Sequence, residues 1–215
     1  RTIKIGSTCY FKHGSETKPA LRKALLIVLG VLFVDQATKL WVKSTMYLGQ
    51  SHEITSWFYI HFTENPGMAF GLEWGGVAGK LALTVFRIIA ICGIIWWLRN
   101  TMKSGATSVA TWGISLILAG AIGNVLDSLY YGVVFSESLG KVATFLPESG
   151  GYAPVLQGRV VDMLYFPLYA GELPGWFPIW GGQFFTFFRP IFNIADVSIS
   201  TGVGLLFVFQ RSVFK

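Results

Sequence analysis

The chain has 215 residues, of which 53% are hydrophobic and only 13% are charged. A soluble domain of this size normally carries about 25% charged residues, so the composition excludes an ordinary soluble protein and indicates a polytopic membrane protein. The formal net charge of +6 does not indicate nucleic-acid binding, because the basic residues are scattered and lie beside apolar stretches. Lipid headgroups and membrane topology explain such residues better.

The N-terminal region combines a basic head with an apolar run. Residues 1–20 are polar and basic without periodicity, which is typical of a cytoplasmic tail or, in part, of an expression remnant. A basic head followed by the apolar run 24–34 also fits a signal peptide, but no small-residue cleavage site follows; the chain continues DQATKLWV. We therefore predict an uncleaved first span over 21–42, with its polar residues in the C-terminal half: Asp35, Gln36 and Lys39.

The next segment, ITSWFYIHFTENPGMAFG (54–71), is rich in aromatic and β-branched residues. Asn65-Pro66-Gly67 is a strong turn signal, so we predict a short strand and turn, which form a small β element outside the membrane. Asn65, near a glycine, has amide and backbone donors suited to an extended peptide. The alternative is an aromatic anchor at the membrane interface.

The second and third spans are predicted over 79–98 and 109–131, because each has about the 20 apolar residues that cross a bilayer. Within AGAIGNVLDSLYYG, Gly120 and Gly123 allow another helix to approach closely. Asn124 and Asp127 are three residues apart, so they share one helical face and look into the bundle. Their alternative role is a structural polar clamp between helices.

The segment 132–189 is long and has no clear periodicity, and loops of this kind are usually functional or mobile. We expect it to move over the site and change substrate access. Its Trp176, Phe177 and Trp180 suit the membrane interface. The alternative is a surface anchor with no part in catalysis.

Two aspartates follow near the end of the chain. Asp162 lies between apolar neighbours in GRVVDMLYFP, which favours its protonated form. Asn193 and Asp196 lie near the N-terminal end of the fourth predicted span, 190–210. Two carboxylates that share one proton form the arrangement of aspartic proteases, in which one activates water and the other protonates the scissile carbonyl. A pair of intramembrane aspartates equally fits a proton-coupled transporter.

The distribution of basic residues predicts the orientation. The head, the link 99–108 and the tail hold ten of the 17 basic residues and only one of the 11 acids, Glu16. By the positive-inside rule both termini and this link are cytoplasmic, and 43–78 and 132–189 lie outside. All intramembrane carboxylates then gather at one depth, near the outer face. The predicted fold is an all-α polytopic membrane protein of four helices with a small extracytoplasmic β element, and its membrane domain spans 21–215.

Five motifs in order resemble the lipoprotein signal peptidases, or signal peptidase II. They are DQATKLWV (35–42), NPGMAFG (65–71), AGAIGNVLD (119–127), GRVVDM (158–163) and FNIADVSI (192–199). The resemblance covers about residues 21–210 and implies a four-span aspartyl protease of the bacterial inner membrane that uses no metal or other cofactor. Such an enzyme cuts the signal peptide from prolipoproteins before a diacylglyceryl-modified cysteine, and globomycin-type lipopeptides are its expected inhibitors.

The resemblance also implies roles for individual residues. Asp162 and Asp196 would be the catalytic dyad. The supporting polar residues around the dyad and substrate would be Asp35, Lys39, Asn65, Asn124, Asp127 and Asn193. The family usually has an arginine directly after the aspartate of the third-span motif, where this chain has Ser128. Arg159 is the candidate substitute and is expected to pair with Asp127.

Two functions from other classes stay open. A proton-coupled transporter would use Asp35, Asp127, Asp162 and Asp196 as a relay, but a relay needs acids or histidines at several depths, and the inner halves of the spans hold none. A non-catalytic scaffold predicts that substitutions in the dyad leave cells unaffected. Lipid-modified prolipoproteins and membrane lipids are the expected partners.

Overall fold

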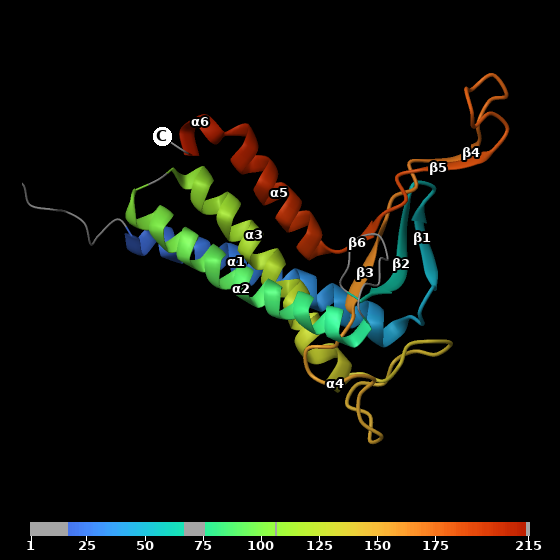
Figure 1. Cartoon of the computed structure of the whole chain (residues 1–215), viewed down its shortest axis with the longest axis horizontal. Coiled ribbons are helices and arrows are strands. Elements are labelled where there is room, and N and C mark those ends of the chain that lie inside the picture. The colour runs from blue at the N-terminus through green and yellow to red at the C-terminus, as the bar shows by residue number, and fades with distance from the viewer. Residues whose placement is uncertain (1–16, 67–75, 106, 214–215) are drawn as a thin grey trace, which may run out of the picture.

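The computed structural model describes residues 17–66, 76–105 and 107–213. Its long helices lie side by side and a small β-sheet covers one end of them (Figure 1). The basic residues of 1–16 and most of the motif NPGMAFG lie outside the described residues. At the end of the bundle away from the sheet, α1 begins, α2 is linked to α3, and the last helices finish (Figure 1).

Among the described residues, three helices are long and apolar enough to cross a membrane: α1 (Thr17–Thr45), α2 (Gly76–Lys103) and α3 (Ser108–Leu126) with its continuation to Val134. Their bounds lie within a few residues of the first three predicted spans. The fourth stretch forms α5 (Ile194–Val208) and the short α6 (Gln210–Val213). The 15 residues of α5 reach only about 22 Å, less than the roughly 30 Å of a bilayer core, so a complete fourth span stays a prediction.

Helix α3 is the centre of the bundle and packs against α1, α2 and α5. The pairing of α3 with α5 depends on glycine, as the sequence predicted for Gly120: a Cβ there would stand 2.2 Å from the carbonyl oxygen of Ala195. At its end α3 continues as a π-helix, Asp127–Tyr131, and a short α4, Gly132–Val134. Single π-helical turns of this kind are frequent at functional sites.

The sheet is larger than the predicted strand and turn. Strands β1 (Ser51–Thr55) and β2 (Phe58–Asn65) form a hairpin, followed by β3 (Val160–Tyr165) and β6 (Ile191–Phe192). The order is β1-β2-β3-β6 and every pair is antiparallel. Because β3 is an inner strand between β2 and β6, Asp162 lies opposite Thr63 in the middle of the sheet.

Two apolar cores hold these parts together. One lies within the helices and includes Ala24, Ile114 and Leu206. The other joins the end of α1 to the sheet and to the segment after α4: Val42, Met46, Phe62, Tyr131, Phe135, Ala143, Val161 and Met163. Ala143 and the buried Ser138 show that 136–157 is packed against the helix ends, so its removal would alter the core as well as any access path.

A second, separate sheet consists of β4 (Tyr169–Glu172) and β5 (Phe184–Phe187). This hairpin leaves the main sheet and extends across, rather than along, the helix axes (Figure 1). Large apolar side chains are also exposed along the helices, among them Phe33, Phe86 and Phe207, as expected for surfaces that face lipid.

Candidate active site

The predicted polar residues converge where α1, α3, the sheet and α5 meet. Asp35 and Lys39 come from α1, Asn124 and Asp127 from the end of α3, Asp162 from β3, and Asn193 and Asp196 from the start of α5. Hydrogen bonds and ion pairs connect all seven of these side chains. The structure therefore brings together residues from four distant parts of the sequence.

Lys39 is fully buried and is the central cation of this cluster. Its Nζ lies 2.9 Å from Asp35 and 2.9 Å from Asp127, and it donates to Asn124 Oδ1 at 3.0 Å. A buried carboxylate without a cation would be strongly destabilising, so one lysine compensates two acids. The spacing of Asp35 and Lys39 by four residues places both on one face of α1.

Asp35 and Asp127 also hold backbone groups of neighbouring elements. Asp35 Oδ1 accepts the N–H of Ala195 at 2.9 Å, near the N-terminus of α5. Asp127 Oδ2 accepts the N–H of Val161 on β3 at 3.2 Å. Gln36 donates to Asp127 Oδ1 at 3.0 Å. These contacts support the structural-clamp interpretation of Asp127 and extend it to Asp35.

Asn193 connects the two carboxyl groups of the predicted dyad. Its side-chain amide donates to Asp162 Oδ1 at 2.6 Å, and its backbone N–H donates to Asp196 Oδ2 at 3.2 Å. Asn193 also begins α5, and its side chain accepts the N–H of Asp196 at 3.0 Å, which completes a capping box. The second oxygen of Asp196 accepts the amide of Asn124 at 2.9 Å.

Asp162 is buried and lies in an environment that favours its protonated form. Burial, and then the negative charge of Asp196, raise the pKa of Asp162 to about 7. The side chains of Asn193 and Asn65 form hydrogen bonds with Asp162 and oppose this rise. Asn65, at the end of β2, thus lies at the site. The predicted turn after it continues into Gly67, which is outside the described residues. An acid whose protonated form is favoured can act as a general acid beside a second carboxyl group.

The expected pairing of Arg159 with Asp127 is wrong. Asp127 is paired with Lys39, whereas Arg159 forms ion pairs with Glu64 and Glu137. Glu64 also forms an ion pair with the fully buried Lys43. Burial alone would raise the pKa of Glu64, but Lys43 and Arg159 hold it below its ordinary value. This ion-pair cluster of Lys43, Glu64, Glu137 and Arg159 fastens α1, β2 and the start of β3.

Neither this ion-pair cluster nor the acids near Arg87 were predicted from the sequence. A usable signal was present for Lys43, which follows Asp35 and Lys39 at the same four-residue interval on α1. Arg87 on α2 interacts electrostatically with Asp196, Asp162 and Asp127. A charged residue in an apolar helix is itself a signal that its side chain faces other polar groups, but the sequence does not identify which acids these are.

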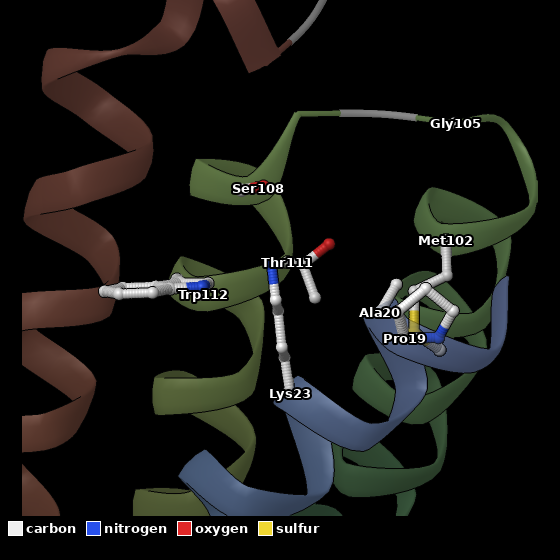
Figure 2. Close-up of a pocket in the computed structure, with 8 residues that line it drawn as sticks. All are labelled: Pro19, Ala20, Lys23, Met102, Gly105, Ser108, Thr111 and Trp112. Atoms are coloured by element: carbon white, nitrogen blue, oxygen red, sulfur yellow. The ribbon is translucent and has the colours of Figure 1, made fainter. Parts of the chain in front are cut away.

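A pocket at the other end of the helices is a poor candidate for the site. It is lined by Pro19, Ala20, Lys23, Met102, Gly105, Ser108, Thr111 and Trp112, and no carboxylate is among them (Figure 2). These residues lie at the start of α1, the end of α2 and the start of α3. The chemistry of paired acids is found only at the sheet end, among the residues that the structure describes.

The chain is similar to known proteins in both sequence and structure. The family profile of signal peptidase (SPase) II matches residues 27–211. A protein named lipoprotein signal peptidase from Porphyromonas gingivalis is 53% identical over 192 residues, covering 88% of this chain and 83% of that protein. One of the same name from Amoebophilus asiaticus is 40% identical over 190 residues, covering 86% of this chain and 76% of the relative.

Two solved structures, each described as a bacterial membrane enzyme, are also similar. One is 27% identical with a TM-score of 0.55 and covers 89% of this chain and 88% of its own. The other is 26% identical with a TM-score of 0.57 and covers 88% and 93%.

Proposed function

The chain belongs to the signal peptidase II family, and from this premise we propose that it is an aspartic endopeptidase acting on lipoprotein precursors. It removes the signal peptide from diacylglyceryl-modified prolipoproteins and cuts before the lipidated cysteine. Its family and its long apolar helices show that the chain is a protease and a multi-pass membrane protein. The aspartic mechanism and the residues that carry it are the proposal.

The bridge that Asn193 makes between Asp162 and Asp196 is the observation that carries the mechanism. In the proposed reaction the ionised member of the pair takes a proton from water as the water attacks the scissile carbonyl. The protonated member donates to the carbonyl oxygen and forms a neutral tetrahedral intermediate. The acid that took the proton from water then protonates the leaving nitrogen as the C–N bond breaks, and the other carboxylate takes back a proton from the intermediate, so the pair again shares one proton.

The remaining polar residues of the site support this pair. Asn124 and Asn193 donate amide hydrogens to the dyad and fix the orientation of its carboxyl groups. Lys39, Asp35 and Asp127 fasten α1, α3, β3 and α5 around it. Asn65 at the end of β2 forms a hydrogen bond with Asp162, and in this proposal it also binds the extended peptide.

The proposal includes the membrane setting. Four helices cross the bacterial inner membrane, both termini are cytoplasmic, and the dyad lies near the outer face, where the substrate's lipid remains in the leaflet. The basic residues that end the helices away from the sheet support this orientation, among them Lys18, Arg22, Lys23, Arg99 and Lys103. Globomycin-type lipopeptides would occupy the same site. Residues 21–215 form the protease domain, preceded by a basic tail.

The test is cleavage of a diacylglyceryl-modified prolipoprotein by purified Asp162→Asn and Asp196→Asn variants. Asparagine keeps the shape of aspartate and one acceptor oxygen. At position 196 this oxygen can still accept the Asn193 N–H at the start of α5, so the melting temperature should stay close to that of the parent. Activity should fall by several orders of magnitude in each variant, and the double variant should be scarcely worse than either, because the two acids act as one unit. Substantial turnover by either well-folded variant would exclude the aspartic mechanism.

A matched control separates catalysis from stability. Asp35→Asn weakens the contact with Lys39, so its melting temperature should drop along with its activity. The transporter alternative finds no support among the relatives described above. Proton uptake that depends on Asp162 in a variant without peptidase activity would revive it.

A further inference from the structure

The β4–β5 hairpin lies outside the protein core, yet most of its side chains are apolar. Residues 168–189 contain two charged residues, Glu172 and Arg189, among Trp, Phe, Tyr, Leu and Ile side chains. Within the part of the chain that the structure describes, the strands pair only with each other, from Tyr169 opposite Phe187 to Glu172 opposite Phe184. An isolated two-stranded hairpin is marginally stable in water, so this one needs an additional partner.

Its apolar side chains are exposed, with Trp176 80% and Ile179 87% accessible at the tip. The others are Leu168, Tyr169, Phe177, Trp180, Phe184, Phe185, Phe187 and Phe188. Consecutive residues of a strand point to opposite faces, so exposure of both Phe184 and Phe185 makes both faces of the hairpin apolar. One-sided docking on another protein would leave one of these faces in water, whereas an apolar medium surrounds both.

The apolar surface continues from the hairpin onto the main sheet. Phe188 contacts Phe192 edge-on, and Phe192 stacks on Phe166 with ring centroids 5.7 Å apart. Phe166 in turn stacks on Phe58 at 4.7 Å and on the half-exposed Trp57 at 6.1 Å. This aromatic row connects the hairpin to the β1–β2 turn, so the exposed surface is part of the sheet end of the protein.

The position of the hairpin and the chemistry of its side chains both indicate that its exposed apolar surface contacts phospholipid. The hairpin extends sideways from the sheet end of the helices, as a segment lying along a bilayer surface would (Figure 1). Trp and Tyr are enriched at the membrane–water interface, and the unpaired backbone groups at the edges of two strands exclude the hydrocarbon centre. A groove of Leu173, Trp180, Gln183, Phe184, Phe185, Thr186 and Arg189 combines apolar walls with one cation suited to a lipid phosphate.

We propose that the β4–β5 hairpin is a membrane anchor that inserts its aromatic side chains at the headgroup–acyl boundary of the leaflet next to the sheet. It holds the sheet, and with it β3, against the bilayer surface. The inference does not depend on the catalytic assignment of Asp162 and Asp196, because it concerns only where the hairpin lies.

The test is the accessibility of a nitroxide attached at Ile179→Cys in the full chain with Cys9→Ala and Cys92→Ala. The protein is reconstituted in vesicles of phosphatidylethanolamine and phosphatidylglycerol. Glu148→Cys, at an exposed turn of 136–157, is the matched control. Both labelled variants should melt like the parent, because neither side chain is packed.

The nitroxide at 179 should be several-fold less accessible to a water-soluble nickel chelate than the one at 148, and more accessible to oxygen. Equal access of the chelate to both positions would overturn the anchor. Shielding from both reagents with spin–spin broadening between labels would also overturn it, in favour of a second copy of this chain. The same nitroxide at Trp180→Cys repeats the measurement at an independent position of the hairpin.

Discussion

At the scale of single residues, the acids of the site divide by the partners they receive. Asp35 and Asp127 share the ammonium of Lys39, whereas Asp162 and Asp196 receive amide donors from asparagines. The sequence predicted that these residues gather, since each polar residue in an apolar stretch needs a partner. It could not predict which acid takes the lysine, because that depends on side-chain distances across four elements. The expected Arg159–Asp127 pair failed for this reason.

The first residue-scale prediction concerns pH. Burial and Asp196 raise the pKa of Asp162 to about 7, so the protonated form of the pair is lost as pH rises through that value. If this form is the active one, kcat/KM should fall about tenfold per pH unit on the alkaline side. The Asn65→Ala variant loses a hydrogen bond that favours the charged form, so its alkaline limb should move to higher pH. An unchanged rate through this range in the parent would contradict the shared proton.

The second concerns the ion-pair cluster beneath the sheet. Glu64 is 2% exposed and faces the fully buried Lys43, so Glu64→Gln should cost about 3–5 kcal/mol in the free energy of unfolding. Glu137 is 41% exposed and pairs only with Arg159 among the ion pairs of the described chain. Glu137→Gln is therefore the control and should cost about 0–1 kcal/mol. Thermal unfolding in one detergent compares them, and equal melting temperatures would remove the cluster's structural role.

At the scale of elements, the spans were predictable and the strands largely were not. Twenty apolar residues are a strong signal, so 21–42, 79–98 and 109–131 correspond to α1, α2 and α3. Strand β3 carries no alternation, because its first four residues are all buried in an inner position of the sheet. Its pairing with β2 joins segments about a hundred residues apart, which no local pattern reveals. The location of Asp162 on a strand therefore came only from the structure.

The element-scale prediction concerns the contact between α3 and α5. Gly120→Ala would place a methyl group 2.2 Å from the carbonyl oxygen of Ala195, next to the start of α5 and its cap. The helices must separate, so we expect a loss of about 1–3 kcal/mol in stability and a loss of activity. Gly204→Ala on α5 is the control, because nothing lies within 4 Å of the added methyl group. A Gly120→Ala protein as stable and active as this control would show that the approach of the two helices can relax freely.

At the scale of the whole molecule, all the contacts of the site lie at one end of the helices. The basic residues Lys18, Arg22, Lys23, Arg99 and Lys103 lie at the other end. By the positive-inside rule this distribution supports the proposed orientation, with the acids at the outer face and the basic end in the cytoplasm. This arrangement suits a substrate whose lipid stays in the outer leaflet, because the peptide next to the lipid reaches the site without crossing the bilayer.

The last prediction tests this orientation in intact cells. In the chain with Cys9→Ala and Cys92→Ala, Ser104→Cys lies in the link between α2 and α3, and Glu148→Cys lies in the segment after α4. Both positions are exposed, so access to a membrane-impermeant maleimide depends on the side of the membrane alone. The reagent should label position 148 in intact cells and position 104 only after the membrane is opened. Labelling of 104 and protection of 148 would reverse the orientation and move the dyad to the cytoplasmic face, where a lipid held in the outer leaflet could not present its peptide.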